Sequence, residues 1–493
     1  MIRSILLTII ILASTIAGPA ERRSVMTAPQ RQDIEKIKAL TEKMLYVPTD
    51  HPEGTGLWLN YFRLMQTKLA LPRLDTSSAG DEEYYSAMMS WLIIGYGVFG
   101  EFVPGSESIG YDNILLRKNF FDHQGTRYGA AVPKWEDVRR SLAPGEVAME
   151  ITAAPEEILL LRHDSQRPQR IPIDSLLMER LSDYNPSDPL TVNEFYSHGS
   201  PLQQLWRLIA GQLNAGETVY LSAANSYALF NYAAIPWQSG VSGDVNNIIR
   251  LNTTATISDW KRRHRKTPRY RSALLLGGVD YGGKTGSPAE LRGSMGYLPA
   301  TLKEVVYADS ILDEKGVATT VLTGSSATRE ALLEALRKPH DIIHLATHGR
   351  TIVNPEPGRG KTRYDITLDG SGLLMADANN SAPLLTARDI MSADLSATKL
   401  VVLSACETAL GDYENLDGAI YSLASAFKRA GAECIIATLW PLPDSAADIA
   451  VKSLYTNILR GLTPDEALAA MRHDMIEAGY ADPYYWANFV AIY

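Results

Sequence analysis

The C-terminal half of the sequence predicts an α/β fold with a mainly parallel sheet and helices on both of its faces. Short apolar runs alternate with segments of helical periodicity from Arg271 onward, and turn residues bound most of the runs. The runs are continuous rather than alternately apolar and polar, which is typical of strands buried on both faces of a parallel sheet. Strands that alternate with helices build such a sheet through helical crossovers.

The expected elements follow in order along residues 271–493. The strands are 273–277, 317–322, 341–348, 399–404, 434–439 and 486–493, and the helices are 301–312, 328–337, 417–430 and two that open near Asp444 and Thr463. Ser326 or Thr328 is placed to cap the helix at 328–337, and Gly431 is placed to end the helix at 417–430.

Upstream, residues 133–260 also predict strands, whereas residues 30–125 look helical. The strands are 147–152, 157–161 and 218–222, with a helix at 202–213. Apolar residues recur at three- and four-residue spacings in 34–44 and 84–99, as in amphipathic helices, and these could be reduced helical-repeat units. The basic run Lys261–Pro268 marks a boundary, and such a run is usually a solvated linker.

Residues 1–20 have the pattern of a signal peptide or membrane anchor. Arg3 precedes the apolar stretch Ile5–Ala17, and Gly18, Pro19 and Ala20 supply small residues for a cleavage site. The apolar stretch is too short to span a bilayer comfortably. We expect an exported or periplasmic protein, membrane-anchored if the segment is not cleaved, and a cytoplasmic protein if the segment is not a signal.

Size and composition limit the function classes. A chain of 493 residues is too long for one ordinary core, so two or three domains are expected. A net charge of −9 argues against a nucleic-acid surface, and two cysteines exclude a disulfide framework. Cys406 follows the end of one strand and Cys434 opens another, which places them roughly 15–20 Å apart and beyond disulfide reach.

Two strand ends carry the predicted chemistry. His348 ends one apolar run, and Cys406 follows the run that ends at Ser404. Working groups of open α/β sheets lie just past the carboxyl ends of strands, so the fold is expected to bring the imidazole and the thiol together as a base and a nucleophile. His344 lies inside its apolar run and is expected to be a packed, hydrogen-bonded core histidine, and Cys434 is expected to be core.

A second motif, a phosphate-loop pattern, would predict nucleotide binding, but the residues after it do not support that interpretation. Residues 278–285 fit the phosphate-loop pattern G-x-x-x-x-G-K-[ST] after a strand. A phosphate loop runs straight into a helix whose N-terminus holds the phosphates. Glycines and a proline follow this one, and no helix is expected before about Pro299. Nucleotide hydrolysis therefore remains a minor alternative.

Several segments of residues 271–493 resemble the CHAT peptidases, which belong to the caspase-like cysteine peptidases. The matching segments are His344–Gly349, Leu403–Thr408, Ala426–Ala432, Thr438–Pro441, Asp444, Glu466–Leu468 and Trp486–Phe489, in the order and spacing of that family. Trp135–Val138 and Pro144–Glu146 also look like the start of the larger module of the family. The resemblance implies a caspase-like catalytic half at 271–493, a degenerate caspase-like half at 133–260 and reduced helical repeats before them.

The resemblance also implies roles for individual residues. Cys406 would be the nucleophile and His348 the general base and acid, and the backbone amides of Gly349 and Cys406 would form the oxyanion hole. Such a dyad calls for no metal and no cofactor. The expected function is that of a cysteine endopeptidase with a protein substrate, no nucleic acid and an activating partner protein.

Two positions bear on the substrate pocket. Metacaspases place an Asp two residues before the nucleophile and caspases a Gln, whereas this chain has Ser404 there. A pocket for an uncharged side chain is therefore expected. Trp440 ends the strand expected beside the cysteine strand, and it either walls this pocket or belongs to the core.

The degenerate half has one further sign and leads to an alternative function. Leu221–Asn225 follows its strand as Leu403–Glu407 follows its own, with Ala224 at the place of the cysteine. A catalytically inactive caspase-like scaffold that binds through its helical N-terminal part is the alternative. Retention of both Cys406 and His348 argues against it.

Overall fold

The computed structural model describes residues 26–44, 106–120, 133–153, 156–264, 268–281, 298–352, 363–376, 383–404 and 423–493, with scattered positions between 56 and 88. Two compact units are present. The first comprises Met1–Pro172, Thr253–Ala255 and Glu356–Ile366, and the second comprises Ile173–Asn252, Thr256–Pro355 and Thr367–Tyr493. The predicted N-terminal segment 1–20 lies outside the described residues. Among the residues that are described, no helix combines the length and apolar character needed to cross a membrane.

The first unit combines helices with a small antiparallel arrangement. Its elements are α2 (Ala28–Met44), α5 (Ser106–Phe120), α6 (Trp135–Ser141), β1 (Glu146–Ala153), β2 (Glu156–Arg162) and β3 (Gln169–Pro172). β2 pairs antiparallel with both β1 and β3. The predicted helix 34–44 lies within α2, and the predicted strands 147–152 and 157–161 lie within β1 and β2. The predicted helix 84–99 falls almost entirely outside the described residues.

A buried carboxylate ties this unit together. Glu150 of β1 is fully buried and accepts hydrogen bonds from the backbone N–H and the hydroxyl of Thr254, at 2.9 and 2.7 Å. The Lys118 ammonium of α5 lies 2.5 Å from the same carboxylate. A buried charge needs such partners, since an unpaired one costs several kcal/mol.

The second unit begins with helices and a pair of parallel strands. These elements are α7 (Ser175–Ser182), α8 (Pro189–Phe195), α9 (Pro201–Ala210), β4 (Thr218–Ala223), η3 (Asn225–Leu229), β7 (Asn247–Arg250) and α11 (Ile257–Arg263). β4 and β7 run parallel. The basic run was expected to be a linker, but Lys261, Arg262 and Arg263 form the last turn of α11. Cations at this position interact favourably with the helix dipole.

The rest of the second unit is the predicted α/β sheet. Its elements are β8 (Ser272–Val279), α12 (Pro299–Glu314), β9 (Ala318–Gly324), α13 (Arg329–Leu336), β10 (Ile342–Ala346), β11 (Gly349–Arg350), β12 (Gly372–Leu374), β13 (Leu384–Thr386), α15 (Ala387–Met391), β14 (Leu400–Ser404), α16 (Leu423–Arg429), β15 (Cys434–Thr438), α17 (Asp444–Leu459), α18 (Pro464–Glu477), α19 (Pro483–Trp486) and β16 (Phe489–Ile492). A further helix, α14 (Arg363–Gly370), precedes β12, and its residues from Thr367 onward belong to the second unit.

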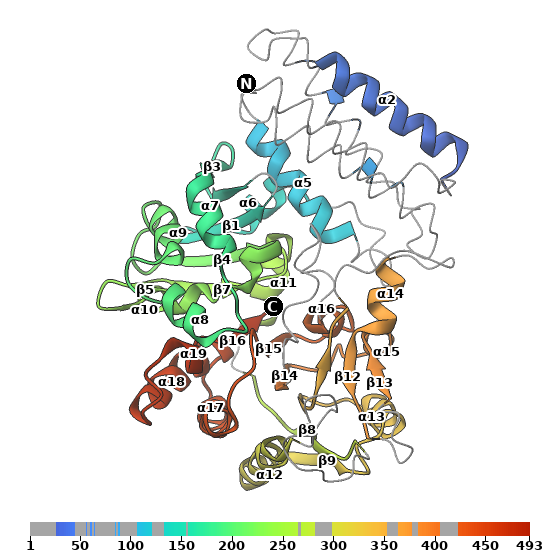
Figure 1. Ribbon diagram of the computed structural model, residues 1–493, viewed down its shortest axis with the longest axis vertical. Helices are drawn as coiled ribbons and strands as arrows, with labels where there is room; N and C mark the ends of the chain where they lie inside the picture. Colours follow the sequence, from blue (N-terminus) through green and yellow to red (C-terminus); the bar gives the residue numbers. More distant parts are fainter. Residues whose placement is uncertain are drawn as a thin grey trace. The chain divides into compact units, whose positions relative to one another are not determined.

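The six main strands lie in the order β16-β15-β14-β10-β8-β9, and Figure 1 shows them with their helices. β16 is antiparallel to β15, and the other neighbours are parallel. Crossovers run one way from β8 to β9 and the opposite way from β9 to β10, β14 and β15. Right-handed crossovers therefore place α12 on one face and α13, α15 and α16 on the other. α12 packs against α17, and α15 packs against α16, so the predicted mainly parallel sheet with helices on both faces is confirmed.

Helix ends follow the expected signals. Thr328, rather than Ser326, caps α13 by accepting from the Ala331 N–H. Gly431 ends α16 with a φ of +110°, and a Cβ there would lie 2.9 Å from the Ser396 nitrogen. The predicted start of this helix at Asp417 lies outside the described residues.

Three features differ from the expectation. β10 ends at Ala346, two residues before His348, and β16 begins only at Phe489 because Pro483 opens the short helix α19. A small antiparallel sheet, β11-β12-β13, was not expected. Gly372 permits it, since a Cβ there would lie 2.0 Å from the Leu385 carbonyl oxygen.

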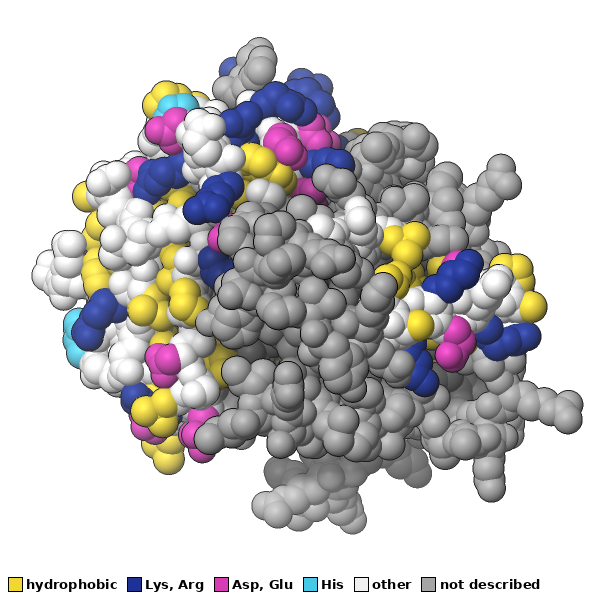
Figure 2. All heavy atoms as spheres, turned by 90° about the horizontal axis from the view of Figure 1, so that it is seen from above, with side chains coloured by type: hydrophobic (Ala, Val, Ile, Leu, Met, Phe, Trp, Pro, Cys, Tyr) yellow, Lys and Arg dark blue, Asp and Glu magenta, His cyan; other side chains and the backbone are white. Residues whose placement is uncertain are grey.

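The surface shows mixed charge where it is described. On the face in Figure 2, acidic and basic side chains of the described residues lie among one another.

β7 lies beside the edge of the main sheet, where Tyr493 follows β16. The Tyr493 N–H donates to the Arg250 carbonyl at 3.0 Å, and the Asn252 N–H donates to the Tyr493 carbonyl at 3.3 Å.

Candidate active site

The strand register defines the candidate active edge. β10 and β14 are parallel neighbours in which Ala346 pairs with Ser404. His348 stands two residues after Ala346, and Cys406 stands two residues after Ser404. Cys406 lies outside the described residues, whereas His348 and Ser404 are both half-buried. We call this region the β10–β14 edge.

His348 is held by the residues around its main chain. Its backbone N–H donates to the Tyr281 hydroxyl at 3.2 Å, and its carbonyl accepts from the Leu374 N–H at 2.9 Å. The Tyr281 ring packs against the imidazole, with centroids 5.2 Å apart. Thr347, just before the histidine, bonds to both Tyr281 and Leu374. The histidine is therefore anchored although the β10 ladder has ended.

Tyr281 was missed by the sequence analysis. It lies inside residues 278–285, which fit the phosphate-loop pattern. Gly278 has a different reason to be glycine: its φ is +57°, and a Cβ would lie 2.8 Å from Leu302 of α12. The helix α12 begins at Pro299, as expected. The remainder of the pattern, from 282 onward, lies outside the described residues.

The Gly349 amide is directed away from the small sheet. Gly349 pairs antiparallel with Leu373 in β11 and β12. The Leu374 N–H donates to the His348 carbonyl, which makes Gly349 and Leu373 a pair that exchanges no hydrogen bonds. In such a pair the N–H groups point away from the partner strand. The Gly349 N–H is thus oriented to serve a group outside this ladder.

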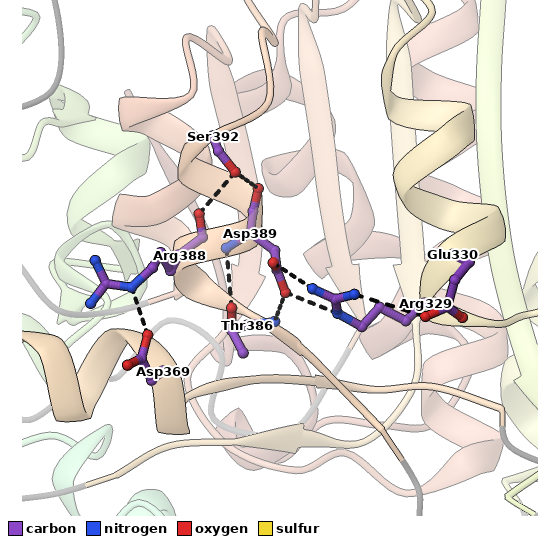
Figure 3. A network of polar contacts seen from close by, with 7 residues as sticks. All are labelled: Arg329, Glu330, Asp369, Thr386, Arg388, Asp389 and Ser392. Carbon is purple, nitrogen blue, oxygen red and sulfur yellow. Dashed lines mark hydrogen bonds and ion pairs between the residues drawn. The ribbon is translucent and has the colours of Figure 1, made fainter.

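The small sheet that carries Leu374 is anchored by the charged network in Figure 3. Arg329 of α13 grips Asp389 of α15 with two hydrogen bonds, at 3.1 and 2.7 Å. Asp389 also accepts from the Thr386 backbone N–H at 2.9 Å, and Thr386 caps α15. Burial acts to raise the pKa of Asp389, but the Thr386 N–H and the Arg329 guanidinium together hold that pKa below its ordinary value.

His344 has a structural role in the core, as expected. It is fully buried, its Nδ1 lies 2.8 Å from the Tyr455 hydroxyl of α17, and its Nε2 lies 3.5 Å from Glu304 of α12. The imidazole and the Tyr455 ring stack with an interplanar angle of 6°. β10 ends between His344 and His348, so the strand alternation does not reach His348.

Cys434 is a buried, free thiol at the other end of the sheet, as predicted. It pairs with Leu400 at the start of β14, whereas the active edge lies past Ser404. Four residues of parallel strand correspond to about 13 Å. Burial raises the pKa of the Cys434 thiol far above its ordinary value, so the thiol stays neutral and unreactive.

Trp440 is packed in the interior. Trp440 is fully buried, and its indole N–H donates to the Tyr484 carbonyl at 2.8 Å. Its ring packs against the Tyr196 ring, with centroids 6.1 Å apart. This geometry favours the core alternative for Trp440. Its place in a substrate pocket, like that of Ser404, stays a prediction.

Within the described ranges, no group of three or more His, Cys, Asp or Glu side chains is arranged to hold a metal ion. The groups assembled at the β10–β14 edge are an imidazole, hydroxyls and a directed backbone amide. Groups of these kinds can take part in acyl transfer when a nucleophile lies beside them.

Comparison with known proteins identifies the family. The CHAT domain matches residues 199–493, which is more than half of the chain. Tetratricopeptide repeat protein 28 of Mus musculus is 30% identical over 251 residues, and the protein of the same name from Homo sapiens is 26% identical over 316 residues. These alignments cover 46% and 59% of this chain, which spans only 10% and 12% of the relatives' length.

A solved structure resembles the fold. The Saccharomyces cerevisiae separase–securin complex at 3.0 Å resolution matches with a TM-score of 0.50 and 10% identity, over 94% of this chain and 40% of that chain. At this identity the likeness concerns the fold alone, and it is the caspase-like arrangement expected from the sequence. Because the CHAT domain matches residues 199–493, the chain belongs to the CHAT-domain family.

Proposed function

We propose that this protein is a cysteine endopeptidase that cleaves protein substrates with Cys406 as nucleophile and His348 as general base and acid. The observation that carries the proposal is the register of β10 and β14, which pairs Ala346 with Ser404. Each proposed catalytic residue stands two positions beyond its member of that pair. Adjacent strands lie about 4.8 Å apart, which supports the proposal that the two side chains past these strand ends come within reach of one another.

The reaction follows from the chemistry of the two groups. His348 takes the thiol proton, and the Cys406 thiolate attacks the scissile carbonyl carbon to form an acyl-enzyme. In this step the imidazolium gives its proton to the amine nitrogen as the scissile C–N bond breaks, and neutral His348 then activates the water that hydrolyses the acyl-enzyme. The outward-directed Gly349 N–H, together with the Cys406 N–H, is proposed to stabilise the oxyanion. One such donor typically contributes a factor of about 10²–10³.

The proposed substrate pocket takes an uncharged residue before the scissile bond. A basic side chain in a closed pocket needs an acidic partner, and Ser404 supplies none where metacaspases have Asp. Asp341 is no substitute, since it precedes β10 and bonds to the Arg271 N–H and Lys399. Glu407, Asp412 and Asp417 follow the nucleophile in sequence. A peptide-library screen tests this proposal, and dominant cleavage after Arg or Lys would refute it and point to one of those carboxylates.

A covalent probe tests the peptidase itself. Peptidyl acyloxymethyl ketones with uncharged and basic recognition residues should label the purified protein, and mass spectrometry should place the adduct on Cys406. Cys406→Ala should abolish labelling and cleavage, whereas Cys434→Ala should preserve both because that thiol is buried. Equal loss in the two folded variants would refute the assignment of the nucleophile.

The alternative is an inactive caspase-like scaffold. This alternative is supported by the similarity to tetratricopeptide repeat protein 28, because the name of that protein refers to repeats and not to catalysis. Absence of labelling and of any proteome-wide cleavage would favour this alternative.

The peptidase proposal includes two further parts: regulation by an activating partner protein, and export directed by residues 1–20. Fractionation of cells that produce the full chain tests the export.

A further inference from the structure

We infer that Tyr281 is a positioning residue for this reaction, because its hydroxyl holds the peptide of His348 where the strand no longer does. The inference rests on the proposed function, since it concerns the aim of the proposed base. β10 ends at Ala346, two residues before His348, so the His348 residue lies beyond the strand. A base two residues past a strand end needs another support to stay aimed at a nucleophile.

That support is a closed ring of four hydrogen bonds around the His348 peptide. The His348 N–H donates to the Tyr281 hydroxyl at 3.2 Å, and the Tyr281 and Thr347 hydroxyl oxygens lie 2.6 Å apart. The Thr347 hydroxyl donates to the Leu374 carbonyl at 2.7 Å, and the Leu374 N–H donates to the His348 carbonyl at 2.9 Å. Both sides of the histidine's main chain are thereby fixed.

The direction of each bond in the ring can be assigned. The single Thr347 hydroxyl proton goes to the Leu374 carbonyl, so the Thr347 oxygen must accept from Tyr281. The Tyr281 hydroxyl therefore donates to Thr347 while it accepts from the His348 N–H. Tyr281 and Thr347 are 6% and 1% exposed, so water does not readily replace these bonds. Removal of either hydroxyl breaks the ring and leaves a buried polar group without its partner.

The end of β8 is shaped to deliver Tyr281 to this place. The pairing of β8 with β9 shifts register between Gly277 and Val279, as a β-bulge that re-aims the side chains after it. Glycines are required there because α12 lies so close: a Cβ on Gly277 would stand 2.4 Å from the Thr301 carbonyl oxygen. The Gly278 N–H donates to the Thr301 hydroxyl at 2.9 Å, and the Asp280 N–H donates to the Gly324 carbonyl at 3.2 Å. The residue before Tyr281 is thus tied to the neighbouring strand.

The tyrosine holds one residue at two points. Its ring packs against the imidazole at 5.2 Å with an interplanar angle of 47°, and its hydroxyl binds the main chain of the same histidine. Phenylalanine would keep the first contact and lose the second. Tyr281→Phe therefore separates positioning by hydrogen bonds from packing.

The test measures reactivity and its pH dependence in the full chain. The second-order rate of Cys406 labelling by a peptidyl acyloxymethyl ketone should fall about 10- to 100-fold in Tyr281→Phe, as expected for a misplaced catalytic group. The loss should lie in the inactivation step rather than in probe binding. The acid limb of the rate should move to higher pH, because a poorly placed imidazolium lowers the thiol pKa less. Thr347→Val should behave like Tyr281→Phe, and Thr347→Ser should restore the rate.

Tyr455→Phe is the matched control. It also removes a buried tyrosine hydroxyl that bonds to a histidine, but that histidine is His344 in the core. Its labelling rate and pH profile should equal those of the wild type even where its stability falls. Rates and profiles of Tyr281→Phe within twofold of the wild type would overturn the inference while leaving the proposed function intact. A wild-type protein that the probe does not label would overturn the proposed function, and this inference with it.

Discussion

The carboxyl ends of two parallel strand pairs in the second unit, β4 with β7 and β10 with β14, differ in how polar groups hold the chain that follows them. At the β4–β7 edge, Ala224 follows β4 and is buried, and Asn225 turns the chain into η3 with a φ of +53°. Arg250 of β7 donates to the carbonyls of Ala228 and Phe230, which end this turn. At the β10–β14 edge, His348 and Ser404 are half-buried, and the Tyr281 hydroxyl accepts a hydrogen bond from the His348 N–H.

The difference teaches where polar groups are used. At the β4–β7 edge the Arg250 guanidinium donates to backbone carbonyls, which fixes the turn after β4. The β10–β14 edge holds His348 by hydrogen bonds to its main chain and by the Tyr281 ring packed against its imidazole. The expectation that residues 133–260 are a degenerate half stays a prediction, and Ala224 at the place of a cysteine fits it.

The largest expected effect distinguishes His348 at the β10–β14 edge from His344 in the core. His348→Ala should lower the rate of Cys406 labelling by about 10²–10⁴-fold, the usual contribution of a general base, with the fold intact. His344→Ala should instead lower the free energy of unfolding by on the order of 3 kcal/mol, because it leaves Glu304 buried without its partner. Urea unfolding and labelling rates, measured side by side, check both effects.

His344→Gln serves if the alanine variant does not fold, since an amide can still bond to Tyr455 or Glu304. A stable but unreactive His344 variant beside a reactive His348→Ala protein would assign the base to His344.

A smaller effect, on stability, is expected from Arg250 at the β4–β7 edge. Arg250→Met should lower the free energy of unfolding by roughly 2–4 kcal/mol, because the carbonyls of Ala228 and Phe230 lose their donor. Labelling of Cys406 in the folded protein should stay unchanged. Arg337→Met is the control, since that side chain is 78% exposed and its removal should change stability by less than about 0.5 kcal/mol. Loss of labelling in a stable Arg250→Met protein would show that the two edges act together.

The smallest effect concerns Asp465, near the place where β7 meets the last strand. Burial raises the pKa of Asp465 from 3.8 to about 6, although the bond from the Tyr493 hydroxyl at 2.6 Å acts against this. The folded protein therefore binds a proton more tightly than the unfolded chain, and stability should fall as pH rises from about 4 to about 6. Asp465→Asn mimics the neutral carboxyl and should flatten this decline, with a gain of about 1 kcal/mol at pH 7 after allowance for partial exposure. Urea unfolding at several pH values checks it, and an undiminished decline in the variant would contradict it.

The sequence by itself determined the strands, the helix ends and the roles of the interior residues. Continuous apolar runs such as Ile342–Ala346 and Leu400–Ser404 become buried parallel strands because only a sheet covered on both faces hides them from water. Thr328, Gly431 and Thr463 end or begin helices by local bonds and backbone conformation. His344 was recognisable as core because apolar neighbours surround it in sequence. Each of these signals lies within a few residues of the feature it predicts.

Only the tertiary structure decided what supports the candidate base. Tyr281 and His348 are 67 positions apart, and their contact depends on a bulge in β8, the approach of α12 and the early end of β10. The β11–β13 sheet and the interior place of Trp440 arise in the same way, from strands and rings that meet across long stretches of chain. No local pattern encodes these contacts, because a hydroxyl has the same sequence signature wherever it points. The packing of the whole sheet selects its partner.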